Sequence, residues 1–514
     1  MPLNRRGSYE LLRRRWYYPC DEWYKKADHA NSEERLQRGA CMAFFRIPIL
    51  SSAMLAILLF LAPEYALAAS MDGAQLSVIW VIPFVCMLLS IAICPLVAGN
   101  FWHHHFGKIS AGWGLAFLIP CAMVFGAGTA FEQFTHAMVA EYVPFIVLLF
   151  ALFTVSGGIR LKGSLVGTPR VNAGILLVGT ILASWMGTTG AAMLFIRPLL
   201  RANAHRKYRV HTVVFFIFLV ANIGGSLTPL GDPPLFLGFL KGVPFFWTLT
   251  HLLLPMAFHV AILLPAYFIL DSILFNKEGR PVPPDSGEGS LKLEGSINFV
   301  LLAGIVGAVL MSGMWKPGVE LPVYGHVTYE LQGLTRDILL LAIAGVSWKI
   351  TSQESRIANG FTWFPIIEVG KLFFGIFMSM IPAIAILQAG SRGALAPVIK
   401  MVSNPDGSPN DLMYFWLTGG LSSFLDNAPT YVVFFNTAGG DPALLTGKLA
   451  STLTAISAGA VFMGANTYIG NAPNFMVRSI AEDQGVTMPS FFGYMLWSVG
   501  ILIPCFILYS LLFM

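Results

Sequence analysis

The feature that most constrains this chain is a series of long apolar segments joined by polar connections. Clear segments lie at 76–97, 112–131, 142–155, 252–270, 297–314, 338–350, 364–387 and 491–512. A helix needs roughly 20 apolar residues to cross a hydrocarbon core about 30 Å thick. Only 11% of the residues are charged, against about 25% in soluble domains. The sequence therefore predicts an all-α polytopic membrane protein with no separate soluble domain.

Charge and cysteine content exclude two other classes of protein. The net charge of +5 is spread over the loops that flank the apolar segments, as expected for loops on the cytoplasmic side of a membrane. We therefore expect no nucleic acid partner. The six cysteines include no Cys-x-x-Cys pair, so they predict neither a disulfide framework nor a metal centre.

The N-terminal part changes character at Met42. Residues 1–41 form a polar, basic extension rich in Arg, Trp and Tyr. Residues 42–70 combine a basic start, an apolar stretch and an Ala-Leu-Ala sequence, the three regions of a secretory signal peptide. A first transmembrane helix with a basic cytoplasmic tail explains the same pattern. If the segment is a signal peptide, the extension reflects a start codon assigned too early.

Two stretches of the chain are related at a constant spacing of 239 residues. The sequence SWMGTTG at 184–190 aligns with SFLDNAP at 423–429, and GSLTPLGDPPLF at 225–236 aligns with GANTYIGNAPNF at 464–475 without a gap. Two motifs that keep one spacing indicate an internal duplication. We expect a first transporter repeat at 76–271, a linker at 272–296 rich in Pro, Gly and charge, and a second repeat at 297–514.

The loops around the first motif of each repeat predict opposite orientations. Short cytoplasmic loops accumulate Lys and Arg. In the first repeat both flanks are basic, so this segment is expected to enter and leave the membrane on one side as a re-entrant hairpin. The second repeat has fewer basic residues there. The pattern predicts inverted-topology repeats. The flanking charges are Arg160, Lys162, Arg170, Arg201, Arg206, Lys207 and Arg209 in the first repeat, and Arg392, Lys400, Lys448, Asp406, Asp411 and Asp441 in the second.

Helix interruptions are predicted at corresponding places in both repeats. Residues 187–190 and 426–429 would form hairpin tips, and 228–234 and 467–473 would unwind the following helices. Lipid tolerates freed backbone groups only where they face protein or a water-filled cavity. Paired interruptions of this kind indicate a transport site near the membrane midplane.

The residues at these interruptions suit a small cation. Hard cations prefer oxygen ligands, and an ionisable residue inside a membrane is a functional hypothesis by default. A buried carboxylate can exchange a proton for a sodium ion, because desolvation favours its neutral form and a cation its charged form. We predict ion-binding and transport roles, with sodium bound by the same residues, for Asp426, Asn427, Asp232, Thr188, Thr189, Thr228, Asn466, Thr467 and Asn471.

Structural alternatives exist for each of these features. Gly and Pro can simply kink a transmembrane helix. Asp is also a favoured N-cap residue, so Asp232, which two prolines follow, fits capping and ion binding equally well. Asp426 lies deeper in an apolar stretch. Sequence alone therefore favours Asp426 as the shared carrier of proton and cation, with Asp232 as a second ligand or proton site.

The motifs resemble those of a known superfamily. ANIGGSLTPLGD at 221–232 resembles the signature of NhaD-type sodium/proton antiporters, and LDNAP at 425–429 resembles their second hairpin tip. The chain from residue 76 onward also resembles the citrate-transporter-like branch of the ion transporter superfamily, including FWHHHFGK at 101–108. The resemblance implies inverted repeats with re-entrant hairpins, a scaffold that often forms a homodimer, and elevator-like alternating access. NTYIGN at 466–471 departs from the antiporter pattern and resembles dicarboxylate carriers.

Two transport functions therefore remain open. The first is sodium/proton antiport, with sodium ions and protons as cargo and no cofactor. The second is sodium- or proton-coupled uptake of citrate or another carboxylate, which would favour basic groups or helix N-termini in the cavity. The basic candidates, Arg197 and Lys241, lie near segment ends, where snorkelling explains them. An intramembrane enzyme is not expected, because His-Glu-x-x-His is absent. The expected location is a lipid bilayer, the inner membrane of a bacterium.

Overall fold

A computed structural model describes residues 71–163, 165–281 and 292–514, which belong to one compact unit, Tyr65–Met514. The expected extension at 1–41 and the signal peptide or helix at 42–70 lie outside the described residues. From the first described residues to the middle of the chain, the elements are η1 (Val78–Val81), α4 (Ile82–Val97), α5 (Gly99–Phe125), α6 (Ala127–His136), η2 (Ala137–Tyr142), α7 (Val143–Ser156), β1 (Arg160–Lys162), α8 (Pro169–Met186), α9 (Thr188–Ala202), α10 (Val210–Leu219), η3 (Ile223–Ser226), α11 (Pro233–Leu240) and α12 (Trp247–Lys277).

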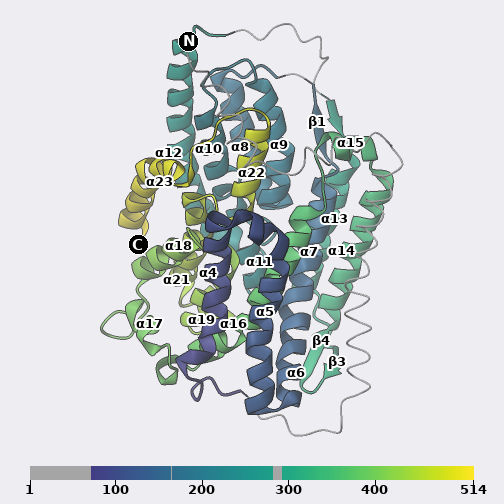
Figure 1. The fold of residues 1–514 in the computed structure, drawn as a ribbon, viewed down its shortest axis with the longest axis vertical. Coiled ribbons are helices and arrows are strands. Elements are labelled where there is room, and N and C mark those ends of the chain that lie inside the picture. Colours follow the sequence, from purple (N-terminus) through teal and green to yellow (C-terminus); the bar gives the residue numbers. More distant parts are fainter. Residues whose placement is uncertain (1–70, 164, 282–291) are drawn as a thin grey trace, which may run out of the picture. The chain divides into compact units, whose positions relative to one another are not determined.

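The second part of the chain is also almost entirely helical (Figure 1). Its elements are β2 (Lys292–Glu294), α13 (Ile297–Met314), β3 (Glu320–Tyr324), β4 (Val327–Glu330), α14 (Leu331–Ile350), α15 (Gln353–Ala358), α16 (Phe364–Gln388), η4 (Gly390–Arg392), α17 (Ala396–Met401), α18 (Asp411–Ser422), α19 (Asn427–Thr437), α20 (Pro442–Thr446), α21 (Ala450–Met463), η5 (Gly464–Asn466), α22 (Ala472–Asp483) and α23 (Phe491–Phe513).

The expected fold class, an all-α polytopic membrane protein, is confirmed. Among the described residues, seven helical stretches are long and apolar enough to cross a membrane. Their outer faces are rich in exposed apolar side chains, such as Leu253, Leu496 and Leu511, as expected where lipid replaces water. The seven stretches are Val78–Val97, Gly99–Phe125, Ala127–Ser156, Trp247–Lys277, Ile297–Met314, Phe364–Gln388 and Phe491–Phe513.

One predicted membrane segment, 112–131, is wrong as a single helix. Helix α5 ends at Phe125 and α6 begins at Ala127, with Gly126 between them at a φ of 91°. This left-handed conformation costs glycine little, since it has no Cβ. The chain bends there, and the continuous α6, η2 and α7 stretch becomes the next membrane segment.

The predicted interruptions are observed in both parts of the chain. Gly187, at a φ of 80°, joins α8 to α9, and residues 423–426 join α18 to α19. Residues 220–232 separate α10 from α11, and 464–471 separate α21 from α22. Helices α11 and α22 both begin beside a proline, at aligned positions. The duplication itself and the opposite orientation of the two repeats stay predictions.

The linker predicted at 272–296 begins later than expected. Helix α12 continues to Lys277, so residues 272–277 are helical. At its other end, β2 pairs with β1 in an antiparallel register, with Leu161 opposite Leu293. Glu294 forms ion pairs with Arg160 and Lys162. This small sheet ties the start of α13 to the segment that follows α7.

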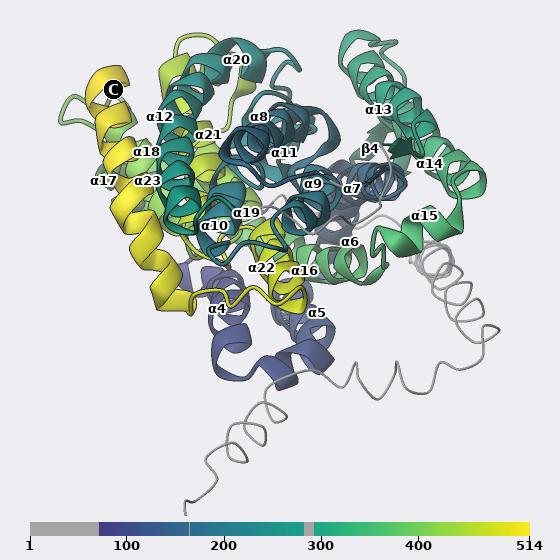
Figure 2. The ribbon, with the colours of Figure 1, turned by 90° about the horizontal axis from the view of Figure 1, so that it is seen from above.

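Packing groups the helices around the interruptions. Helix α18 packs on α21, α8 on α9, and α11 on α19, so elements of both parts meet. Helices α13, α14 and α7 pack on one another, and Figure 2 shows α13, α14 and α15 together at one side of the helices that carry the interruptions. The interrupted segments therefore lie in the interior of the bundle.

Candidate functional site

The carboxylate of Asp232 lies where the interrupted segments meet, and this residue is 1% exposed. Three neutral side chains donate hydrogen bonds to it. Thr188 Oγ1 donates to Oδ1 at 3.1 Å, Asn471 Nδ2 to Oδ1 at 3.1 Å, and Asn427 Nδ2 to Oδ2 at 2.7 Å. These donors come from three different segments, two of them in the second part of the chain. The site is therefore shared between both predicted repeats.

The two aligned positions, 232 and 471, contact each other directly. Asn471 Nδ2 also lies 3.3 Å from the carbonyl oxygen of Ala221 and 3.2 Å from Asn222 Oδ1. Asn222 Nδ2 in turn donates to Asn474 Oδ1 at 2.7 Å. These bonds satisfy backbone and amide groups that the broken helices α10 and α21 leave free, as a buried site requires. They also join the two interruptions into one polar network.

Each interruption is held by the same pair of hydrogen bonds. The hydroxyl of Thr228 donates to the carbonyl of Ser184, and the hydroxyl of Thr467 donates to the carbonyl of Ser423 at 2.5 Å. Both threonine hydroxyls then accept a bond from the amide two residues later, at 3.1 and 3.2 Å. The hairpin and the unwound segment of each part are thereby fixed against each other in the same way.

Glycines allow the unwound segments to cross closely. A Cβ atom on Gly231 would lie 2.2 Å from the carbonyl oxygen of Gly225, and a Cβ on Gly470 would lie 2.5 Å from that of Gly464. These distances are far inside van der Waals contact. The aligned glycines of the two motifs are therefore required by the close approach of backbone to backbone.

Asp426 has a different environment from Asp232. It is the N-cap residue of α19, where its Oδ1 accepts from the amide of Ala428 at 3.1 Å, and it is only partly buried. Asp232 also stands at an N-cap position, before α11, but its side chain makes no capping bond. The sequence argument favoured Asp426 over Asp232 as the carrier; in the structure, Asp232 is the more deeply buried of the two.

The other predicted residues lie around this centre with distinct contacts. Asn427 is buried, and its Oδ1 accepts from Ser422 Oγ at 2.6 Å. Asn466 Nδ2 donates to Ser423 Oγ at 2.9 Å, while its buried Oδ1 has no hydrogen-bond partner. Thr189, next to Thr188 in α9, is partly buried. Thr188, Asn427 and Asn471 contact Asp232, whereas Thr228, Thr467 and Asn466 contact the aligned serines.

Sequence reasoning missed several members of this network. Ser184 and Ser423 each bind the interrupted segment of their own part, through hydroxyl and carbonyl groups. Their identity at the first position of the aligned hairpin motifs was a usable signal. Asn222 and Asn474 gave no such signal, because the residues aligned with them are Val461 and Leu235.

The basic residues considered for an anion site lie away from Asp232. Arg197 is nine residues beyond Thr188 along α9, a rise of about 13 Å, and its guanidinium lies against Gly360. Lys241 pairs with Glu141 at 2.7 Å. The ion pairs found among residues 71–163, 165–281 and 292–514 do not include Asp232 or Asp426. The central carboxylate is thus neutralised by no partner in the described part of the chain.

No group of three His, Cys, Asp or Glu side chains in the described ranges could hold a metal ion. Any ion at the centre would depend on the two carboxylates, on amide and hydroxyl oxygens, and on freed carbonyls. That set suits a hard cation rather than a transition metal, because transition metals prefer imidazole or thiolate ligands.

Comparison with known families agrees with this geometry. A family model described as "Putative citrate transport" matches residues 73–514, which contain the whole described bundle. The chain belongs to this family. It is accordingly an integral membrane protein of the ion transporter superfamily and a secondary transporter. No curated protein matches the chain.

Proposed function

We propose that this citrate-transport family member exchanges sodium ions for protons, with Asp232 as the shared binding group. The observation that carries the proposal is a carboxylate 1% exposed whose side-chain donors are all neutral and come from both parts of the chain. A buried, unpaired charge in a membrane is costly. Asp232 therefore favours a state in which either a proton or a cation neutralises it.

The neighbouring amides suit both states. An Asn side chain carries a donor and an acceptor, so Asn427 and Asn471 can donate to the carboxylate and, after rotation, offer an oxygen to a cation. The unpartnered Oδ1 of Asn466 is a further oxygen ligand in the second part of the chain. We assign sodium coordination to this set, with Thr188, Thr189, Thr228 and Thr467 supplying hydroxyl or backbone oxygens and Asp426 adding charge.

Coupled uptake of citrate or another carboxylate is the second candidate. Four helices, α9, α11, α19 and α22, begin at the interruptions, and a helix N-terminus attracts anions. The family description also favours this function. The position of Arg197 and Lys241 away from Asp232 argues against it, because a tricarboxylate at the centre would lack a basic side chain.

The test is a pH-gradient assay in proteoliposomes, with sodium added first and citrate second. Sodium alone should release internal protons from liposomes that contain the wild type but not from those that contain Asp232→Asn. If sodium alone has no effect, and citrate enters only when an ion gradient is present, the protein is a carboxylate symporter and the antiport proposal fails.

Three further properties belong to this proposal. We expect the protein to use no cofactor, to form a homodimer, and to reside in the inner membrane of a bacterium. Chemical cross-linking of the purified protein in liposomes tests the dimer: a single monomeric band at saturating reagent would contradict it.

A further inference from the structure

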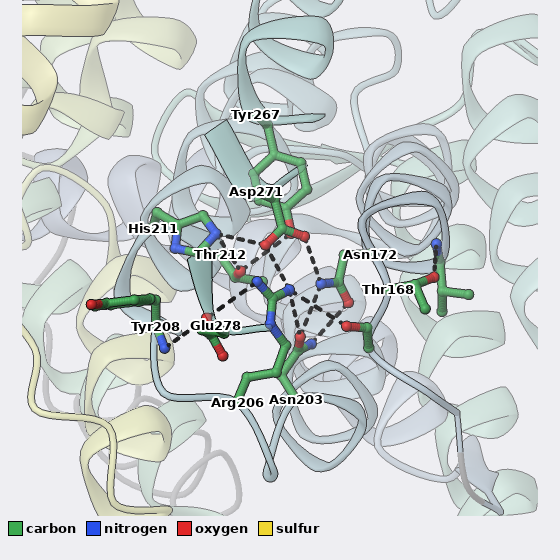
Figure 3. Close-up of polar contacts among 12 residues, drawn as sticks. Thr168, Asn172, Asn203, Arg206, Tyr208, His211, Thr212, Tyr267, Asp271 and Glu278 are labelled. Carbon is green, nitrogen blue, oxygen red and sulfur yellow. Dashed lines mark hydrogen bonds and ion pairs between the residues drawn. The ribbon is translucent and has the colours of Figure 1, made fainter. Parts of the chain in front are cut away.

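A buried charged cluster lies where α8 begins and where α9 and α12 end (Figure 3). Asp271, near the end of α12, is fully buried and pairs with Arg206 at 2.6 Å. His211 Nε2 lies 2.9 Å from the same carboxylate, and Asn172 Nδ2 donates to it at 3.0 Å. The Arg206 guanidinium also lies 5.0 Å from the ring centre of Phe275. A cation is thus held between a carboxylate and an aromatic ring.

Three of the aligned positions in the second part line a cavity instead. At the spacing of 239 residues, Arg206 aligns with Leu445, which is fully buried, and Asp271 aligns with Ser510. Asn172 aligns with Asp411, Thr212 with Ser451 and Phe275 with Met514. Asp411, Ser451 and Met514 line a cavity of about 380 Å³. The remaining lining residues are Thr250, His251, Leu254, Pro255, Thr454, Tyr509 and Phe513.

The lining of the cavity suits a cationic group. Asp411 is its only carboxylate, and neither Lys nor Arg is among the lining residues. Its Oδ1 accepts from Thr452 at 2.6 Å, which leaves the second carboxylate oxygen for a ligand. The rings of Tyr509 and Phe513 stack with centres 5.1 Å apart, and aromatic faces attract ammonium groups. The hydroxyls of Thr250, Ser451 and Thr454 add hydrogen-bond acceptors.

The surroundings of the cavity suit an amphiphile. It lies between α12, α18, α21 and α23, and its neighbours on the outer surface are exposed apolar side chains. Leu254 is 61% exposed, Leu253 52% and Leu512 62%. A small soluble amine would gain nothing from these side chains, whereas an acyl chain would cover them.

We propose that this cavity binds the ammonium head group of a membrane lipid, a phosphatidylethanolamine, with Asp411 as its counter-ion. The head group supplies a cation beside Asp411, as Arg206 supplies one beside Asp271 in the first part, and the acyl chains lie along α12 and α23. The volume of about 380 Å³ is many times the roughly 10–15 Å³ that a cavity needs to hold one water molecule, so it leaves room for a head group. The site is separate from the Asp232 centre and does not depend on the transported ion.

Native mass spectrometry of the full-length protein tests this site with three probes: phosphatidylethanolamine, phosphatidylglycerol and free ethanolamine. We expect a bound phosphatidylethanolamine whose affinity falls about tenfold in Asp411→Asn, the loss of one charge-assisted contact. The matched control Asp406→Asn changes a carboxylate in the exposed loop before α18 and should bind like the wild type. Leu254→Trp, which enlarges a side chain of the cavity lining and leaves Asp411 unchanged, should also weaken binding.

Each alternative result overturns the assignment. Equal retention of phosphatidylglycerol would identify ordinary annular lipid. Competition by free ethanolamine at the same concentration as the lipid would identify a soluble amine as the occupant. Unchanged binding in both Asp411→Asn and Leu254→Trp, each with the elution volume of the folded wild type, would place the lipid elsewhere.

Discussion

The two interrupted regions of this transporter are fixed by matching threonine hydrogen bonds but differ in how they bury charge. In the first part, Asp232, Arg206 and Asp271 are all almost completely buried. Their aligned residues in the second part are Asn471, Leu445 and Ser510, which are neutral. The second part places its own carboxylates, Asp411 and Asp426, at helix beginnings, where they are only partly buried.

The two regions therefore have similar hydrogen bonds at their interruptions but different chemical groups at the aligned positions 232 and 471. The threonine and serine bonds that fix each interruption occur in both parts, because both backbones must make the same crossing. The proposed exchange of a cation for protons needs only one buried carboxylate. A second carboxylate at position 471 would lie in direct contact with the first, and like charges at that distance repel strongly.

The largest effect should follow from Asp232→Asn. This change removes the buried titratable group and replaces it by an amide of nearly the same volume. Sodium-driven proton release should therefore fall to the level of empty liposomes. Asp232→Glu keeps the charge and should retain measurable exchange. If Asp232→Asn exchanged sodium for protons at the rate of the wild type, Asp232 would not be the shared binding group.

The charged cluster at the other end of the first part predicts a large loss of stability. Arg206→Met should destabilise the protein by about 3–5 kcal/mol, because it leaves Asp271 buried without its partner. Thermal unfolding in detergent measures the effect. The double variant Arg206→Met/Asp271→Leu removes both charges and should recover most of the loss. A double variant as unstable as the single one would contradict this explanation.

The variant Asn471→Ala tests how much the second part of the chain contributes to the site at Asp232. Loss of a hydrogen bond to a charged group costs about 1.5–3 kcal/mol, so the apparent affinity for sodium should fall at least about tenfold. Sodium-dependent proton release at a series of sodium concentrations provides the measurement. Asn474→Ala, which loses contacts with Asn222 and backbone carbonyls but none with Asp232, controls for general loosening of the interruption.

A small effect is expected from Asp426→Asn. Asn is as good an N-cap as Asp, so α19 should keep its start and exchange should stay within about threefold of the wild type. Asp426→Ala should lower stability by about 1 kcal/mol, the usual loss of an N-cap. Complete loss of exchange in Asp426→Asn would restore the ranking that the sequence alone gave.

The smallest effect concerns the β1–β2 pairing outside the membrane segments. Burial alone would raise the pKa of Glu294, but hydrogen bonds from Lys162 and Ser355 and the charge of Lys162 outweigh it and hold the pKa below the usual 4.5. The stabilisation is therefore complete above pH 4.5 and is lost as the pH falls through the lower folded value.

Glu294→Gln should consequently lower stability at pH 7 by at most about 1 kcal/mol, as for other surface ion pairs. At a pH below both values, the variant and the wild type should unfold at the same temperature. Glu354→Gln, an exposed acidic residue in α15, is the control. A deficit of Glu294→Gln that persists at low pH would assign Glu294 a packing role.

Much of the candidate site could be predicted because the responsible signals are local. Gly187 and Pro233 mark interruptions that follow from backbone conformation, and the 239-residue spacing linked Gly187 to Asp426 and the neighbouring Asp232 to Asn471. The relative importance of the two carboxylates could not be predicted. Both follow similar motifs, and only the crossing of Asn427 and Asn471 over Asp232 determines which one is enclosed.

The sequence by itself determined the membrane class, the positions of the helix breaks and the residue types gathered at them, because apolar length, proline and glycine act within a few neighbouring residues. Only the tertiary structure decided which groups are desolvated. Asp232 is enclosed by side chains from both parts, Asp426 caps a helix, and Asp271 of α12 is paired with Arg206 of the segment between α9 and α10. Burial depends on contacts between residues far apart in the chain, and no local pattern records those contacts.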